Sequence, residues 1–344
     1  MKKHVIKKYS KSSNFYNEIK TDFFSQNERL LKNALKINKL YSKQKKRTSC
    51  KLCGAKLKSS PDFRKHNIQY VFCRECDHLN GVHTDSREFA NKIYSDDDGS
   101  KYSNFYLDDK YESRIQNIYM PKIEFIDDYV DKGMSIFDFG CGLGHFVDSA
   151  LRLGYDAKGA DVSKVLVKNG NLAIKHKHDI EPLHQVKSEE VSSLIQPMKV
   201  DILSALAVME HLVDLESFIN SVKKCEFKYF YYSVPTYGLS VSIETVFEEV
   251  FPRHLSSGHT HLFTEKSLEL LHKKLGVKPI AQWRFGTDIM DFRRSLDVML
   301  KKADASDFFR ERVFQETQEY GDKLQNIIDE SHNCSQIHVL TKKI

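Results

Sequence analysis

The sequence has no long apolar run and no secretory leader. No stretch of eighteen or more apolar residues occurs in the 344 residues, so we expect no membrane-spanning helix. The N-terminus, MKKHVIKKYS, is basic but lacks the apolar segment and small-residue cleavage site of a secretory signal. We therefore expect a cytoplasmic protein, in which clustered cysteines favour metal binding over disulfides.

Acidic residues are scarce at the start of the chain. Residues 1–48 contain 14 lysines and arginines against three acids, whereas the rest is mildly acidic. This segment predicts a basic helical arm with Phe24, Leu31, Leu35 and Ile37 near one face, which would pack on a partner element. The alternative is a grip on nucleic acid or on an anionic membrane surface.

Four of the seven cysteines form two CxxC pairs separated by nineteen residues, in a context unlike that of a thioredoxin. Two such pairs complete a tetrahedral zinc site, so residues 49–82 predict a zinc ribbon. The expected ligands are Cys50, Cys53, Cys73 and Cys76. Four thiolates leave no open position, which makes the zinc structural. His66 and His78 lie nearby and are interpreted as surface histidines.

Short apolar segments alternate with amphipathic ones across residues 116–344, after a linker or lid at 83–115. The alternation predicts a doubly wound α/β fold with a seven-stranded, mostly parallel sheet. We expect strands at 134–140, 156–163, 182–186, 200–209, 227–235, 278–286 and 335–343. We expect helices at 145–154, 164–176, 215–225 and 264–276, and a helical insert at about 288–331.

The stretch FDFGCGLGHF, residues 137–146, follows the first of these strands. Its spacing is G-x-G-x-G, and histidine stands where a dinucleotide fingerprint has its third glycine. Asp161 ends the next strand, where a carboxylate can accept both hydroxyls of a ribose. Ligands of such sheets bind at the carboxyl ends of the strands, so both features lie at the expected site.

The segments IFDFGCGLG, GADVS, ALAVMEHLVD, YYSVP and HLFTEKSLELLHKKLG span about 134–276. In this order and spacing they resemble the class I S-adenosylmethionine-dependent methyltransferases. The resemblance implies that the cofactor is contacted by Asp138, Gly140, Gly142 and Gly144. It further implies that Asp161 holds the ribose diol and that Ser188 or Glu189 serves the adenine.

A CxxC module before such a domain further resembles a subset of these enzymes that methylates sugars or nucleotide sugars. The segment WRFGTDIMDFRRSL is similar to the same glycan-associated group. This second resemblance implies a small-molecule acceptor, namely the hydroxyl of a sugar, nucleotide sugar or glycan.

A hydroxyl acceptor needs a base, and His211 in the MEHL segment is the first candidate. Glu210 would orient it or bind a substrate hydroxyl, and His259 or His261 is the reserve base. Some relatives carry a carboxylate three residues before the Glu-His pair and bind a divalent ion. Ala207 occupies that position here, which argues against such a site.

Residues 94–115 are rich in tyrosine, aspartate and lysine. They are either a polar linker or a lid in which Tyr102, Tyr106 or Tyr111 closes over the cofactor. Two alternatives to a sugar methyltransferase stay open, an RNA methyltransferase that uses the ribbon and basic arm, and a non-catalytic scaffold subunit. The sequence leaves the oligomeric state open.

Overall fold

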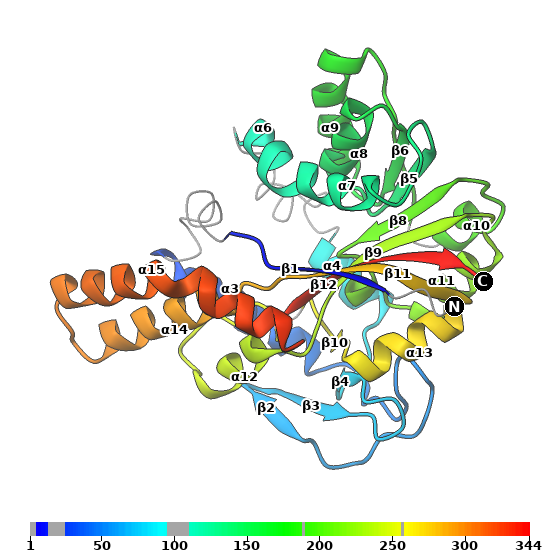
Figure 1. The fold of residues 1–344 in the computed structure, drawn as a ribbon. Helices are drawn as coiled ribbons and strands as arrows, with labels where there is room; N and C mark the ends of the chain where they lie inside the picture. The colour runs from blue at the N-terminus through cyan, green and yellow to red at the C-terminus, as the bar shows by residue number, and fades with distance from the viewer. Residues whose placement is uncertain (1–4, 13–24, 95–109, 188–189, 256–257) are drawn as a thin grey trace.

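The computed structural model describes residues 5–12, 25–94, 110–187, 190–255 and 258–344, and its centre is an eight-stranded sheet (Figure 1). The strands lie in the order β1 (Ile6–Tyr9), β11 (Val277–Arg284), β12 (Gln336–Lys343), β9 (Tyr229–Pro235), β8 (Ile202–Leu206), β5 (Ser135–Phe139), β6 (Asp156–Asp161) and β7 (Leu183–Gln185). All neighbours are parallel except β12, which is antiparallel to β9 and β11.

The predicted mostly parallel sheet is therefore confirmed, but the predicted count of seven strands is wrong. The extra strand is β1, which pairs with β11 at the edge of the sheet. Its sequence, IKKY, is too short and too rich in lysine to show a strand pattern, because an edge strand has little apolar surface to bury.

Helices cover both faces of the sheet because successive side chains of each strand point to opposite sides. On β5, Ile136 packs under α7 (Met120–Asp127), α8 (His145–Arg152) and α9 (Lys164–His178), which lie above the sheet in Figure 1. Phe137 and Phe139 face the opposite way, toward α11 (Leu215–Lys224) and α13 (Glu265–Leu275). The short α10 (Val191–Ile195) packs beside α11.

The ends of α13 show why this helix was predictable. Thr264 caps its first turn and forms a reciprocal capping box with Ser267. Gly276 ends it at φ 68°, in the left-handed region that favours glycine. Local chemistry thus sets both boundaries of the helix that follows the 258–264 segment.

The cysteine module forms a second, four-stranded sheet of β2 (Phe63–Lys65), β3 (Ile68–Phe72), β4 (Leu79–Gly81) and β10 (His261–Leu262). The fourth strand comes from the α/β body, antiparallel to β4. Leu52 and Val71 also belong to the same apolar cluster as α11 and α13. The module is therefore built into the body by both backbone pairing and a shared core.

The N-terminal helix α3 (Asn27–Tyr41) packs through a face that includes the predicted Ile37 but not the predicted Leu35. Its buried side chains are Asn27, Ala34, Asn38 and Tyr41. Leu35 is 40% exposed, because it lies about 100° around the helix from Ala34. Tyr41 instead packs against Phe89 of α4 (Arg87–Tyr94), with the rings tilted and their centroids 5.4 Å apart. Phe24 lies outside the described residues.

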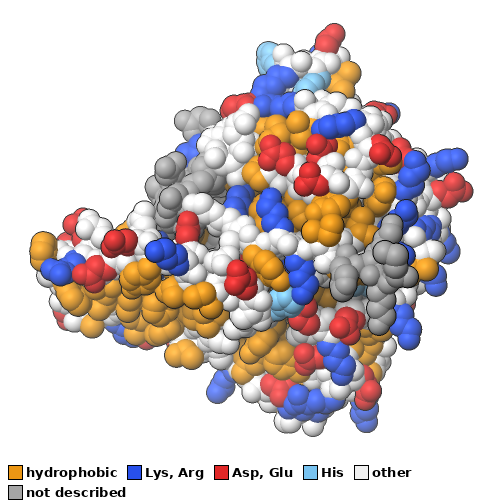
Figure 2. Space-filling view, viewed as in Figure 1, with side chains coloured by type: hydrophobic (Ala, Val, Ile, Leu, Met, Phe, Trp, Pro, Cys, Tyr) orange, Lys and Arg blue, Asp and Glu red, His pale blue; other side chains and the backbone are white. Residues whose placement is uncertain are grey.

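The remaining helices are α6 (Tyr111–Arg114), the π-helix η2 (Ile115–Tyr119), the 3₁₀ turn η3 (Met209–His211), α12 (Leu239–Val246), α14 (Asp288–Lys302) and α15 (Asp307–Glu330). The last two form the predicted insert, a hairpin that projects from the body (Figure 1). Large apolar side chains lie exposed on this hairpin (Figure 2), namely Phe292, Phe308, Phe309, Tyr320, Leu324 and Ile327.

Within the part of the chain that the structure describes, no helix combines the length and apolar character needed to span a membrane.

Candidate active site

The glycine loop connects the end of β5 to the start of α8. Gly140, Gly142 and Gly144 have φ of +73°, +54° and +72°, a backbone conformation that other residues rarely adopt. A Cβ at Gly140 would lie 2.5 Å from Val208 Cγ2, so the loop touches the segment after β8. A Cβ at Gly142 would meet nothing within 4 Å. The loop therefore has one open side, where a ligand can approach the backbone.

Two carboxylates flank this loop. Asp161 Oδ2 accepts a hydrogen bond from Gly142 N at 2.9 Å, and its Oδ1 accepts one from Ser163 N at 2.8 Å. Asp138 Oδ1 accepts one from the Ser204 hydroxyl at 2.7 Å. Burial raises the pKa of Asp138 to about 7. Carboxylate oxygens have further lone pairs, so Asp161 fits a ribose diol beside the open side of Gly142.

The predicted adenine contacts cannot be placed in the same way. Ser188 and Glu189 lie outside the described residues, just beyond β7.

An aromatic stack covers the N-terminus of α8, next to the glycine loop. The His145 ring lies between Tyr111 and Tyr119, at 4.6 and 4.8 Å between ring centroids. Of the three tyrosines predicted for a lid, Tyr111 is thus packed on His145, while Tyr102 and Tyr106 lie outside the described residues.

The 3₁₀ turn η3 places the Glu-His pair just past β8. Glu210 is 2% exposed, and its Oε2 has no hydrogen-bond partner among the described residues. Burial raises the pKa of Glu210 to about 8 and lowers that of His211 to about 4. His211 Nδ1 lies 2.8 Å from Gly258 O, to which it can only donate. Its Nε2 then carries the lone pair, 4.0 Å from Glu210 Oε1.

His259 joins this pair from the 258–264 segment. Its ring centroid lies 4.9 Å from that of His211, and its Nδ1 faces His254 O at 3.2 Å. Burial lowers the pKa of His259 to about 3. Ligand atoms of Glu210, His211 and His259 lie within 4.8 Å of one another, so the trio could also seat a divalent cation. The sequence argument from Ala207 did not foresee His259 beside the pair.

His261 lies apart from this trio. Its Nδ1 is 2.8 Å from His78 Nε2, in the buried contact between β10 and the cysteine module. The expectation that His66 and His78 are surface histidines is wrong. His78 is fully buried, and the half-buried His66 ring bonds to Glu248 O at 2.8 Å. Both rings are covered because the module docks on the body instead of standing free.

A small hollow with room for about one water molecule lies beside His211. Its lining comes from α4, from Asp85 two residues before that helix, from the segment after β8 and from the 258–264 segment: Asp85, Phe89, Ala90, Ile93, His211, Val213, Gly258 and Thr260. The hollow is therefore walled on one side by the region following the cysteine module and on the other by the candidate base.

Asp85 is the charged group of this wall. It forms ion pairs with Arg47, at 2.7 Å, and with Lys51, which lies between the first two cysteines. Burial disfavours the charged form, but the two cations outweigh it and hold the pKa of Asp85 below its usual range. Thr260 Oγ1 also donates to Asp85 Oδ2 at 3.1 Å. The hollow thus has an ionised carboxylate in its wall.

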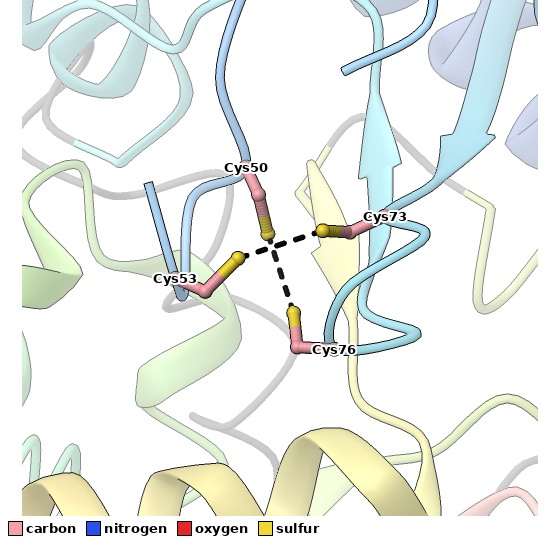
Figure 3. A group of neighbouring side chains, drawn as sticks. All are labelled: Cys50, Cys53, Cys73 and Cys76. Carbon is pink, nitrogen blue, oxygen red and sulfur yellow. Dashed lines mark hydrogen bonds between the residues drawn. The ribbon is translucent and has the colours of Figure 1, made fainter. Parts of the chain in front are cut away.

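The four predicted cysteine ligands converge on one centre (Figure 3). Cys50 Sγ and Cys76 Sγ are 3.7 Å apart, and Cys53 Sγ and Cys73 Sγ are 3.5 Å apart. Tetrahedral zinc with bonds of about 2.3 Å places its sulfurs about 3.8 Å apart. The cluster therefore has the dimensions of a tetrahedral Cys₄ metal site.

Sequence reasoning missed most of the lining of this hollow. Asp85, Phe89 and Thr260 belong to segments far apart in the chain, and none stands in a recognisable motif. Sequence reasoning also did not single out Lys122, which lies near Asp138. Burial lowers the pKa of Lys122 to about 8. Of the residues predicted for this region, His211 lines the hollow, whereas His259 and His261 do not.

A family model described as a methyltransferase domain matches residues 111–282, half of the chain. Among curated proteins, the ubiquinone biosynthesis O-methyltransferase of Cupriavidus pinatubonensis is 29% identical over 93 residues, 26% of this chain and 35% of that protein. That of Paraburkholderia phymatum is 27% identical over 107 residues, 30% of this chain and 44% of that protein. The chain thus spans less than half the length of these relatives.

Among solved structures, magnesium protoporphyrin IX methyltransferase from Synechocystis PCC 6803, with bound S-adenosylhomocysteine, has a similar fold. The TM-score is 0.51 at 11% identity, and the match covers 75% of this chain and all of that one. At this identity the likeness concerns the fold alone.

Proposed function

This chain belongs to the methyltransferase-domain family and is a class I S-adenosylmethionine-dependent methyltransferase; from that premise we propose that it methylates a hydroxyl of a small molecule, a sugar or nucleotide sugar. The observation that carries the proposal is the orientation of His211. Its Nδ1 is engaged by Gly258 O, which leaves Nε2 as a proton acceptor in the wall of a small hollow. His211 follows three residues after Val208, the residue that contacts the glycine loop at Gly140.

Oxygen as the acceptor atom is further supported by the two curated relatives, which are both O-methyltransferases. The sugar class rests on the resemblance of the cysteine module and of the WRFGTDIMDFRRSL segment to glycan-pathway enzymes. The scaffold alternative is not retained, because the chain is a methyltransferase.

When bound, S-adenosylmethionine supplies the electrophilic methyl group. The open side of Gly142 and the Asp161 carboxylate hold the donor, while His211 Nε2 takes the proton of the acceptor hydroxyl. Burial lowers the pKa of His211, so the ring is neutral and able to accept at neutral pH. The Glu210 carboxyl lies 4.0 Å from Nε2; because burial raises its pKa to about 8, it is mostly protonated at neutral pH and acts as a polar neighbour that orients the ring, not as a counter-charge.

The same proposal includes a structural zinc ion on Cys50, Cys53, Cys73 and Cys76. The sulfur spacing supports it, and four thiolates leave no position for substrate. Elemental analysis of the purified chain should find about one zinc per molecule. Free, titratable thiols without zinc would rule it out.

Two measurements test the function. Calorimetry should show binding of S-adenosylhomocysteine, and methyl-labelled donor should then label UDP-glucose or GDP-mannose in preference to a transfer RNA mixture. If S-adenosylhomocysteine does not bind, the proposed donor site is wrong. Labelling of RNA alone, with affinity that falls steeply with salt, would favour the RNA methyltransferase alternative with the basic N-terminal segment as its grip.

Treatment with a chelator tests whether the Glu210–His211–His259 trio binds a divalent cation instead of acting as a base. A general base needs no ion, so brief treatment with EDTA should leave turnover unchanged while zinc content is monitored. Loss of turnover that Mg²⁺ or Mn²⁺ restores would reassign the trio from acid–base chemistry to a cation site.

A further inference from the structure

Apolar side chains line one side of the α14–α15 hairpin and stay in contact with solvent (Figure 2). We propose that this face is a dimer interface, on which the hairpins of two copies of the chain pack antiparallel around a two-fold axis and form a four-helix bundle. The inference goes beyond the proposed function, because it assigns a self-association surface and uses no residue of the candidate active site.

The first step is the spacing of the side chains. A helix presents residues three and four positions apart on the same side, and both helices of the hairpin repeat apolar residues in this way. The stripe on α14 runs from Ile289 to Met299, and the stripe on α15 runs from Phe309 to Ile327 with Glu316 as its one polar position. None of the apolar members is buried: Ile289, Phe292, Leu296, Met299, Phe309, Val313, Tyr320, Leu324 and Ile327.

The second step is the direction in which the two stripes face. The helices run antiparallel and touch through Arg293 and Thr317, at 3.1 Å, and through Arg310 and Asp297, at 2.9 Å. Each stripe lies about 80° around its own helix from these contacts, at about 100° per residue. Because the helices run in opposite directions, both stripes face the same side of the hairpin, and Figure 2 shows apolar side chains along its length.

The third step is the size of this face. Phe309, Tyr320 and Ile327 are 48%, 45% and 61% exposed. A whole large side chain has about 200 Å² of surface, so the two stripes together expose about 500 to 600 Å² on each copy. A standard interface buries about 800 Å² on each partner, of which about 60% is nonpolar. The face therefore matches the nonpolar area that a stable dimer needs.

The fourth step is the charge along the hairpin, which favours a second copy as the occupant. Residues 301–312, at the tip, contain four lysines and arginines against three acids, whereas residues 316–330 contain five acids against one lysine. Antiparallel packing places the basic tip of one hairpin on the acidic half of the other. Parallel packing would bring the two acidic stretches together, and an anionic lipid surface would repel the same acids.

The fifth step is the position of the hairpin. It projects from the body, so a second hairpin can lie along it (Figure 1). The stripe from Phe309 to Ile327 is about 27 Å long at a rise of about 1.5 Å per residue, or about five helical turns. That length lets two hairpins overlap from tip to base while each body stays at its own end of the bundle.

Sedimentation velocity of the full chain tests the proposal. At about 100 µM, the wild type should sediment with about twice the 40.0 kDa mass of one chain. The double variant Phe309→Glu/Ile327→Glu should stay monomeric, because dimerisation would bury unpaired carboxylates. Both side chains are exposed on a single copy, so its circular dichroism and its affinity for S-adenosylhomocysteine should equal those of the wild type.

Leu172→Glu is the matched control. Leu172 is 53% exposed, but it lies on α9 and not on the hairpin. This variant should dimerise as the wild type does. If the double variant does not fold, Tyr320→Lys places one charge in the middle of the α15 stripe and should also give a monomer.

Reversing charge tests the antiparallel arrangement. Glu319 and Glu330 are exposed on the acidic half of α15. In the antiparallel dimer they face a basic tip, so Glu319→Lys/Glu330→Lys should raise the dimer dissociation constant about 10-fold. In a parallel dimer the same variant would relieve repulsion and lower the constant, which would contradict the arrangement.

Several results would overturn the inference. A wild type that is monomeric at about 100 µM has no such interface. A dimer that Phe309→Glu/Ile327→Glu leaves intact uses another surface. A mass that keeps growing with concentration contradicts a two-fold contact, because such a contact closes on itself. A monomeric wild type that cosediments with phosphatidylcholine vesicles, while the double variant does not, would reassign the face to a lipid surface.

Discussion

The donor side and the acceptor side of the active site are built in opposite ways. The described residues that we propose for the methyl donor lie between 138 and 161, on two adjacent strands and the loop between them. The proposed acceptor side combines the turn at 209–211 with the 258–260 segment, and Asp85 lies against them because the cysteine module docks on the body. One half is encoded locally, and the other depends on tertiary contacts.

His211→Ala separates the two sides most strongly. Removing a general base typically costs about 10²- to 10⁴-fold in rate, so turnover should fall by that factor. S-adenosylhomocysteine affinity, measured by calorimetry, should stay within about twofold, since Gly142 and Asp161 are untouched. Retained turnover would move the base to His259 or to His261, which lies in β10 beside His78.

Cys73→Ser should break the acceptor side through the module. We expect zinc content to fall, together with loss of acceptor turnover, because Lys51 and β4 no longer hold Asp85 and Thr260. Donor binding should persist. Cys225→Ser, an isolated buried cysteine, should leave the zinc content unchanged. Loss of donor binding in Cys73→Ser but not in Cys225→Ser would show that the two sides are not separable.

Asp161→Asn should weaken the donor side alone. A hydrogen bond to a charged group is worth about 1.5–3 kcal/mol, so the dissociation constant for S-adenosylhomocysteine should rise about 10- to 100-fold. Saturating donor should restore most of the turnover. Asp156→Asn, an exposed carboxylate at the other end of β6, is the matched control and should bind as wild type does.

Protonation of the buried His272 on α13 should have the smallest of these effects. Burial lowers the pKa of His272 to about 4, and its Nε2 accepts from Tyr232 Oη at 2.6 Å. The unfolded chain binds this proton near pH 6.5, so stability present above that pH is lost as pH falls toward 4.

Urea unfolding should therefore give about 1–3 kcal/mol less stability at pH 4.5 than at pH 7 from this group. His272→Gln should show a shallower pH dependence. An identical pH slope in the variant would place the acid sensitivity elsewhere.

Sequence patterns predicted the donor side well because its signals are local. The segment MSIFDFG is the predicted buried strand, β5, and Gly140, Gly142 and Gly144 form the predicted loop after it, in the left-handed conformation. Class and donor followed from this stretch. Ser188 and Glu189 stay predictions, and so do the roles of Asp138 and Asp161.

The acceptor side could not be predicted because no local rule brings its parts together. Asp85 stands in an ordinary polar stretch, and only the pairing of β4 with β10 brings it beside Thr260. The same docking buried His78, which the sequence placed at the surface. On α3, Tyr41 is buried and Leu35 is exposed, because the helix packs against Phe89 of α4 and the sequence did not indicate α4 as its neighbour.

The strand pairing between β4 and β10 involves only two residues of the body, His261 and Leu262. This short pairing is reinforced by the apolar core that the module shares with α11 and α13. Module and body should therefore unfold together, as one cooperative unit. A change at the inner face of the module, at Leu52 or Val71, would then lower the stability of the whole chain and not of the module alone.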